Sequence, residues 1–172
     1  MTRALILAAG GSRRFGSPKQ LALIEGRPLL AHVLAIAAPH RPLTVLGAAA
    51  DEILRAVDVG DHVIAEDWAD GQSASLRAGL AALGPADRVL VLLGDMPYVT
   101  REVIAAVLAA DGCARATYGG RPGHPVVLDR AVLDRVGDLR GDTGARDLLS
   151  GCVEIEASHL SDPTDIDTPD QL

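Results

Sequence analysis

Aromatic residues are almost absent from this sequence: Phe, Trp and Tyr together make up 2% of its 172 residues. The apolar fraction is nevertheless 48%, so the core must be built mainly from Ala, Leu and Val. Such a core suits helices packed on a parallel sheet. No run approaches the ~18 apolar residues that a membrane-spanning helix needs. The first apolar run leads into a glycine loop and does not resemble a signal peptide, so we expect a cytoplasmic enzyme with no membrane partner.

The sequence also has few cysteines and no excess of positive charge. The two cysteines, Cys113 and Cys152, lie far apart and match no metal-binding or redox spacing. We expect both to be buried small apolar side chains, because the sequence supports no disulfide framework. The formal net charge of −7 argues against a nucleic-acid partner or an anionic membrane surface, since either would need a broad basic face. A local basic pocket is still compatible with this balance.

The length favours a single domain over residues 1–172, long enough to bury roughly 70% of its unfolded surface. Short apolar runs alternate with stretches of helical periodicity along most of the chain. This alternation predicts an α/β layer fold with a mainly parallel sheet and right-handed crossovers. Strands are expected at 4–9, 43–46, 62–65, 88–93, 113–118 and 153–155, and helices at 29–38, 51–57, 73–83, 101–110, 131–136 and 145–149.

Some details of these elements can also be predicted. The run Arg88–Leu93 is apolar after its first residue, so we expect a central strand that is covered on both faces. Asp51, Ser73 and Thr100 are good candidates for helix caps. The glycine- and proline-rich residues 119–125 are interpreted as a long connection.

A glycine loop follows the first predicted strand. The apolar run Ala4–Ala9 stops at Gly10–Gly11, and the polar loop that comes next ends on Lys19. Paired glycines let the backbone turn tightly and let its N–H groups approach a ligand. Arg13 and Arg14 add positive charge to the same hollow. The sequence therefore predicts a polyphosphate site.

Lys19 is the only lysine beside fifteen arginines. A compact ammonium suits a point contact to phosphate oxygens better than a planar guanidinium does, although a solvated loop lysine is the plainer interpretation. Two better-known phosphate loops are excluded. A P-loop needs Lys-Ser/Thr directly after its second glycine, and here Ser17–Pro18 intervene. The spacing of the glycines also differs from the dinucleotide fingerprint.

Carboxylates provide a candidate metal site. Asp95 follows the strand 88–93, and Mg²⁺ is usually held by only one or two carboxylates, with phosphates and water completing the octahedron. The alternative is that Asp95 caps the next turn. Asp162, Asp165 and Asp167 form a second acidic cluster, which is an exposed tail unless it lies near Asp95. His124 is either a substrate contact or a polar turn residue, and no covalent nucleophile stands out.

These motifs together resemble the MobA-like nucleotidyltransferases, and within that family they are most similar to the molybdenum cofactor cytidylyltransferases. The resemblance covers nearly the whole chain, with the motifs in the right order. They are LAAG at Leu7–Gly10, SRRFGSPK at Ser12–Lys19, DWADGQSASL at Asp67–Leu76, LGDMP at Leu93–Pro97, GHP at Gly123–Pro125, GDTGAR at Gly141–Arg146 and DIDTP at Asp165–Pro169.

The resemblance implies a fold, a reaction and a set of site residues. The fold is a single Rossmann-like three-layer α/β domain with a mixed, mainly parallel sheet. The reaction transfers CMP from CTP to the phosphate of molybdenum-loaded molybdopterin and releases pyrophosphate, with Mg²⁺ as the cofactor. The implied catalytic residues are Lys19, Arg14 and Asp95, and the implied metal ligands are Asp95 and Asp167. The residues implied to bind the nucleotide are Leu7, Ala8, Ala9, Gly10, Gly11, Lys19, Asp67, Ser73 and Ser75. Those implied on the acceptor side are His124, Asp142, Gly144 and Arg146.

Three assignments remain open at this point. Guanylyltransferases of the family tend to have Leu-Ala-Gly-Gly in the loop, so LAAG favours cytosine, with GTP as the alternative. Another small phosphate could be the acceptor. A third possibility is a non-catalytic accessory protein that helps to mature a molybdenum hydroxylase, and such an enzyme or its maturation factor is the macromolecular partner that the resemblance implies.

Overall fold

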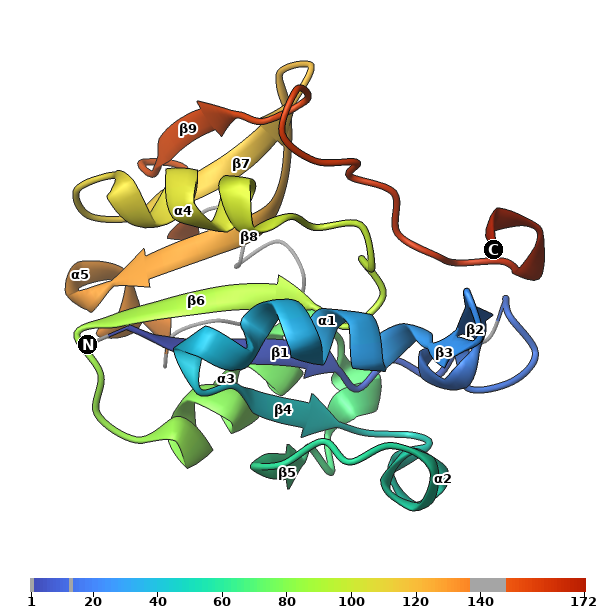
Figure 1. The fold of residues 1–172 in the computed structure, drawn as a ribbon. Coiled ribbons are helices and arrows are strands. Elements are labelled where there is room, and N and C mark those ends of the chain that lie inside the picture. Colours follow the sequence, from blue (N-terminus) through green and yellow to red (C-terminus); the bar gives the residue numbers. More distant parts are fainter. Residues whose placement is uncertain (1, 13, 137–147) are drawn as a thin grey trace.

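Helices cover both faces of one seven-stranded sheet in the computed structural model, which describes residues 2–12, 14–136 and 148–172 (Figure 1). The strand order is β5-β4-β1-β6-β8-β7-β9. Strand β8 runs antiparallel to both of its neighbours, and every other pair in the sheet is parallel. This confirms the mixed, mainly parallel sheet. The strands are β1 (Arg3–Ala8), β4 (Leu43–Leu46), β5 (His62–Ile64), β6 (Arg88–Leu93), β7 (Ala114–Tyr118), β8 (Arg121–Asp129) and β9 (Val153–Glu156).

The core has two halves, one on each face of the sheet. Alternate residues of a strand point to opposite faces, and in β1 Ile6 packs into one cluster while Leu5 and Leu7 pack into the other. Helices α1 (Leu29–Ala37), α2 (Ala50–Ala56) and α4 (Arg101–Ala109) cover the Ile6 face, and α3 (Gln72–Leu83) and α5 (Arg130–Leu133) cover the other. Figure 1 shows α1 and α4 in front of the sheet and α3 behind it.

Strand β6 is fourth of the seven, and its residues Val89 to Leu92 are all buried. The predicted central strand is therefore confirmed. Shorter elements complete the description: a hairpin of β2 (Leu23–Ile24) and β3 (Arg27–Pro28), and 3₁₀ turns at Lys19–Leu21, Ala38–His40, Trp68–Asp70 and Pro169–Gln171. No helix within the described ranges is long and apolar enough to cross a lipid bilayer.

Helix starts are only partly as predicted. Thr100 does cap α4, since its hydroxyl accepts a hydrogen bond from the N–H of Val103 at 3.3 Å. Asp51 is not a cap but lies in the first turn of α2, where a carboxylate still faces the positive end of the helix. Ser73 is not a cap either: α3 begins one residue earlier, after Gly71, and Ser73 is 1% exposed.

The predicted long connection at 119–125 is wrong. Gly119 and Gly120 have φ angles of 58° and 75°. Positive φ at both turn residues closes a tight hairpin whose geometry matches the right-handed twist of the two strands. The chain therefore turns back at once, and β8 begins at Arg121. Helix α5 is also shorter than the predicted 131–136, ending at Leu133. Most of the helix expected at 145–149 lies outside the described residues.

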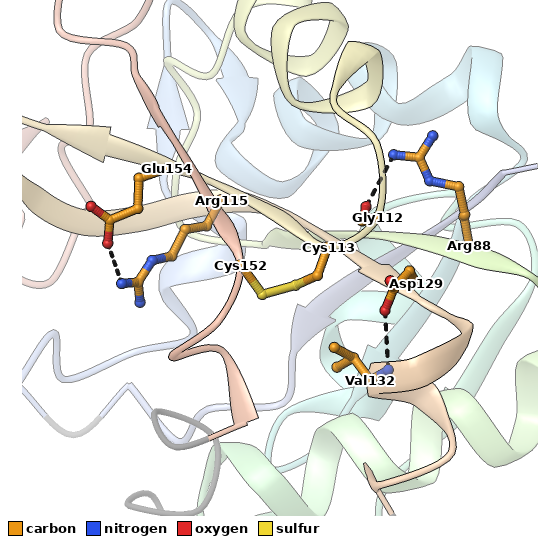
Figure 2. Close-up of a disulfide and its surroundings, with 8 residues drawn as sticks. All are labelled: Arg88, Gly112, Cys113, Arg115, Asp129, Val132, Cys152 and Glu154. Atoms are coloured by element: carbon orange, nitrogen blue, oxygen red, sulfur yellow. Dashed lines mark hydrogen bonds and ion pairs between the residues drawn. A yellow bond between two sulfur atoms is a disulfide. The ribbon is translucent and has the colours of Figure 1, made fainter.

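The two cysteines form a disulfide, which overturns the expectation that they are separate apolar side chains (Figure 2). Strands β7 and β9 are parallel neighbours with Ala114 opposite Val153. The preceding residues, Cys113 and Cys152, therefore face each other with their Cα atoms 4.7 Å apart. Their separation of 39 positions gave no indication of this, because the pairing depends on the return of β9 to β7.

Candidate active site

The glycine loop and Asp95 lie side by side because β1 and β6 are parallel neighbours. Leu7 pairs with Leu93 in the ladder, and the N–H of Gly94 donates to the carbonyl of Leu7 at 2.8 Å. Ligands of open α/β sheets bind beyond the carboxyl ends of such strands. Figure 1 shows this end of β1, β4 and β6 on the right, together with the β2–β3 hairpin and the C-terminal segment.

Gln20 and Ser12 fix the shape of the glycine loop. The Gln20 amide is buried and donates to the carbonyl of Ala8 at 2.8 Å and to that of Gly10 at 3.4 Å. The Ser12 hydroxyl accepts from the backbone N–H of Lys19 at 3.1 Å and donates to Gln20 Oε1 at 3.4 Å. Sequence reasoning missed Gln20. The available signal was a polar residue between Lys19 and the apolar stretch that starts at Leu21.

The ammonium of Lys19 lies between two carboxylates that are far apart in the sequence. Its Nζ donates to Asp95 Oδ2 at 2.7 Å and to Asp167 Oδ1 at 2.9 Å. Burial opposes the charge, but the negative charge of Asp95 and the hydrogen bonds to Asp95 and Asp167 outweigh it and raise the pKa of Lys19 above 10.5. Lys19 is therefore a fixed positive charge at neutral pH.

Asp167 reaches this site because the C-terminal segment is anchored beside β6. Ile166 is 0% exposed, and its N–H donates to the carbonyl of Asp95 at 2.9 Å. Gln171 Oε1 accepts from the N–H of Asp167 at 2.8 Å and so holds the turn. Arg14 Nη2 adds a second cation, 2.5 Å from Asp167 Oδ2. The hydrogen bond from Lys19 is the main cause that lowers the pKa of Asp167 below its ordinary 3.8.

Three carboxylates gathered at this site could hold a divalent cation. One oxygen from each of Asp95, Asp165 and Asp167 lies within 4.8 Å of the other two. Among the residues that the structure describes, the buried Asp95 Oδ1 has no hydrogen-bond partner, which leaves a lone pair for a ligand. Carboxylate oxygens are the donors that Mg²⁺ prefers, so the residues fit this ion. Asp162 is not part of the group, because its Oδ1 accepts from the Thr164 N–H at 2.8 Å in a local turn.

A cavity of about 320 Å³ opens beside these charges. Most of the loop residues expected to bind a nucleotide line it, and Ser75 does so from α3, whereas Gly11 lies just outside it and is exposed. Asp67 does not line it: that residue is exposed, with Oδ2 3.8 Å from Arg77 Nη2. The lining residues are Leu7, Ala8, Ala9, Gly10, Lys19, Gln20, Trp68, Ala69, Gly71, Gln72, Ser75, Leu93, Gly94 and Asp95.

A second cavity, of about 450 Å³, adjoins the first at Leu7 and Gln72. It is lined by Ser73, which was expected on the nucleotide side, and by His124, which was expected on the acceptor side. Burial lowers the pKa of His124 to about 4, so its imidazole is neutral at pH 7. The Tyr118 hydroxyl donates to the carbonyl of His124 at 2.8 Å. Three further expected acceptor residues, Asp142, Gly144 and Arg146, lie outside the described residues.

Comparisons with known proteins bear on the family and the fold of the chain. A family model described as a MobA-like NTP transferase domain matches residues 4–159. The bifunctional protein GlmU of Rhodospirillum rubrum is 34% identical over 145 residues, which cover 79% of this chain and 32% of that protein. The chain thus spans about a third of the length of the curated relatives it matches.

Solved structures extend the similarity to almost the whole chain. The crystal structure of Rv0371c from Mycobacterium tuberculosis H37Rv matches with a TM-score of 0.83 and 32% identity, covering 98% of this chain and 93% of that one. A structure of Rv0371c in complex with manganese matches with a TM-score of 0.70 and 27% identity, covering 90% of this chain and 87% of that one. The fold is therefore shared with proteins of similar size.

Proposed function

The chain belongs to the MobA-like NTP transferase family, and from that membership we propose that it is a nucleotidyltransferase. In the proposed reaction, CMP passes from CTP to the phosphate of molybdenum-loaded molybdopterin, and pyrophosphate is released. The observation that carries the proposal is the position of Lys19, with Nζ 2.7 Å from Asp95 Oδ2 and 2.9 Å from Asp167 Oδ1 beside the glycine loop. The ammonium offers a positive charge to the phosphates of a nucleoside triphosphate, and the carboxylates offer oxygen ligands to a divalent cation.

The proposed chemistry requires positioning and charge neutralisation more than proton transfer. An oxygen of the acceptor phosphate attacks the α-phosphorus in line, and the bond from that phosphorus to the β-phosphate oxygen breaks. Both reactants are anionic, so fixed cations stabilise the charge that accumulates between them. Lys19 and Arg14 supply such cations, and the Gly10–Gly11 loop supplies backbone N–H donors. The acceptor phosphate is already ionised near pH 7, so the reaction needs no general base.

Magnesium is the proposed cofactor. Asp95 and Asp167 would hold it, and the bound ion would neutralise phosphate charge. Support comes from the unpaired Oδ1 of Asp95 and the three clustered carboxylates. The manganese complex of the mycobacterial relative, at 27% identity, is further support for a divalent ion in this fold.

The choice of CTP rests on the sequence Leu7–Gly10, which reads LAAG. The choice of acceptor rests on the resemblance of the chain to molybdenum cofactor cytidylyltransferases, with His124 and the second cavity on the acceptor side. A molybdenum hydroxylase or its maturation factor would then receive the product.

A comparison of four nucleotides tests the proposal. The protein is given CTP, GTP, ATP and UTP in turn with Mg²⁺ and molybdenum-loaded molybdopterin, and pyrophosphate release is measured. We expect CTP to give the fastest release. Preference for GTP would make the protein a guanylyltransferase, and release with another small phosphate alone would replace the acceptor. Nucleotide binding without release of pyrophosphate from any of the four would leave only the accessory role.

A further inference from the structure

Trp68 is the only tryptophan in the sequence, and it lies on the wall of the 320 Å³ cavity. It opens the 3₁₀ turn Trp68–Asp70 that leads into α3. The residue is half-buried and packs against the core cluster on the α3 face. A large flat side chain thus faces a cavity that is otherwise lined mainly by small residues.

Gly11 makes room for this indole, and Gly47 makes room for the Cβ of the same residue. A Cβ on Gly11 would lie 3.0 Å from Trp68 Cζ3 and 3.1 Å from Cη2, and one on Gly47 would lie 2.9 Å from Trp68 Cβ. Neither Gly11 nor Gly47 has a positive φ, so both are needed for space rather than for backbone freedom. The loop after β1 therefore packs against the indole ring, whereas the turn after β4 packs against the Cβ of Trp68 and, more closely, against the carbonyl oxygen of Ala9.

Polar groups with no partner line the same cavity as this ring. Among the described residues, none accepts a hydrogen bond from the indole N–H or pairs with the side chains of Gln72 and Ser75. Ser75 is nevertheless only 5% exposed. A flat apolar surface beside unpaired hydrogen-bonding groups suits a planar heterocycle, whose faces stack and whose edge donates and accepts hydrogen bonds.

We propose that Trp68 is the surface against which the base of the bound nucleotide lies, and that Gly11 is glycine because this indole packs on it. The inference rests on the proposed nucleotide transfer and deepens it, since it separates a base subsite at Trp68 from the phosphate subsite at Lys19 and Asp95. The base is the ligand class, and its stacking on Trp68 contributes to nucleotide affinity without contributing to the chemical step.

Three variants of Trp68 test the contact. Trp68→Phe keeps a flat ring, Trp68→Leu keeps apolar volume without one, and Trp68→Ala removes both. The probes are CTP and inorganic tripolyphosphate, each with Mg²⁺, measured by calorimetry. We expect the Ala and Leu variants to bind CTP on the order of tenfold more weakly and the Phe variant to recover most of the loss. Tripolyphosphate has no base, so we expect all three variants to bind it as tightly as the wild type does. In turnover, we expect the Ala and Leu variants to show a higher KM for CTP and an unchanged kcat.

The outcomes separate this inference from the proposed function. Equal CTP affinity in the wild type and in the Ala and Leu variants overturns the inference and leaves the transferase intact. A parallel loss of tripolyphosphate affinity also overturns it, because Trp68 would then only support the loop. A wild type that binds neither probe overturns the proposed function and, with it, the base subsite.

Gly11 gives an independent test through a double-mutant cycle. Gly11→Ala should weaken CTP binding in the wild type but have little further effect in the Trp68→Ala background, and additive losses would contradict the coupling. Gly10→Ala is a control for packing in the nucleotide-free protein only, since no atom lies within 4 Å of a Cβ placed there but Gly10 itself lines the nucleotide cavity. We expect Gly11→Ala to shift the fluorescence emission of Trp68 and Gly10→Ala to leave it in place.

Discussion

The backbone N–H of Ile166 donates to the carbonyl oxygen of Asp95 at 2.9 Å. This bond, with the buried Ile166 side chain, brings the C-terminal segment to the end of β6. The neighbouring residue Asp167 then meets both Lys19 and Arg14. An acidic stretch that composition alone would leave in solvent becomes part of the charged site, and this relationship leads to the first prediction.

Asp167→Asn should impair the enzyme, and Asp162→Asn should not. Asp167 pairs with two cations and lies in the carboxylate group, so its loss should raise the Mg²⁺ requirement by on the order of tenfold or more. Asp162 belongs to the same segment but accepts only within its own turn, a role that Asn can keep. Magnesium titration of pyrophosphate release compares the two variants, and an equal shift in both would contradict the assignment.

Lys19→Met should lower turnover by roughly 10²- to 10³-fold, the usual effect of removing one fixed group that stabilises transition-state charge. It also leaves Asp95 and Asp167 without the ammonium between them. We therefore expect Mg²⁺ to raise the melting temperature of Lys19→Met more than that of the wild type, since the ion can take over this role. Thermal melts of both proteins with and without Mg²⁺ measure this difference in melting temperature.

A double variant, Lys19→Met with Asp167→Asn, is the control for that prediction. It lacks the repelling pair of carboxylates, so the extra effect of Mg²⁺ should disappear. If Mg²⁺ raised the melting temperature of the wild type, Lys19→Met and the double variant equally, the ion would be binding elsewhere.

The Lys19–Asp167 pair should stabilise the fold over a wide pH range with two limits. The pKa of Asp167 is lowered, so its contribution is present above 3.8 and is lost as the pH falls through the lower folded value. The pKa of Lys19 is raised, so its contribution is present below 10.5 and is lost as the pH rises through the higher folded value. Urea midpoints of the wild type and Asp167→Asn should differ by a constant amount between these limits.

Comparing the two proteins at each pH matters because Glu156 also titrates in acid. Hydrogen bonds from Ser158 and from the N–H groups of Gly119 and Gly120 lower the pKa of Glu156 to about 2. Both proteins keep this carboxylate, so its effect cancels in the difference. A difference that persisted unchanged well below pH 3.8 would show that Asp167 stabilises the fold without its charge.

Removing the disulfide with Cys113→Ser and Cys152→Ser should cost about 4 kcal/mol of unfolding free energy, from the chain entropy of a closed loop of this length. Urea denaturation measures the loss. A thiol reductant should destabilise the wild type to a similar extent and leave the double variant unchanged. Equal stability of all samples would show that the Arg115–Glu154 ion pair beside the bridge (Figure 2) and the β7–β9 ladder suffice.

Local patterns were enough to predict the parts of the site that follow strands. The Gly10 loop comes directly after an apolar run, Asp95 comes one residue after another, and the carboxyl ends of parallel neighbours lie together. The layered fold and the central position of β6 followed from the same alternation. The approach of Asp167 could not be predicted from composition, because it depends on one isolated apolar residue, Ile166, finding a buried place.

Other features depend on how distant segments pair. The disulfide follows from the register of β7 and β9, which no spacing between Cys113 and Cys152 reveals. Gln20 acts through the carbonyls of Ala8 and Gly10, so its role appears only once the loop has folded back. Ser73 is a residue type that often caps helices, but α3 begins one residue before it. Ser73 is therefore buried within the helix and lines the second cavity.

Lys19 carries the only side-chain amine in the sequence, and this limits how the protein can be labelled. Acylating reagents aimed at lysine have a single side chain to modify, and modification would remove the charge that Asp95 and Asp167 share. Thiol reagents find both cysteines already joined. Surface attachment for binding studies is therefore better directed at an affinity tag, whereas acylation protected by nucleotide would report directly on occupancy of the site.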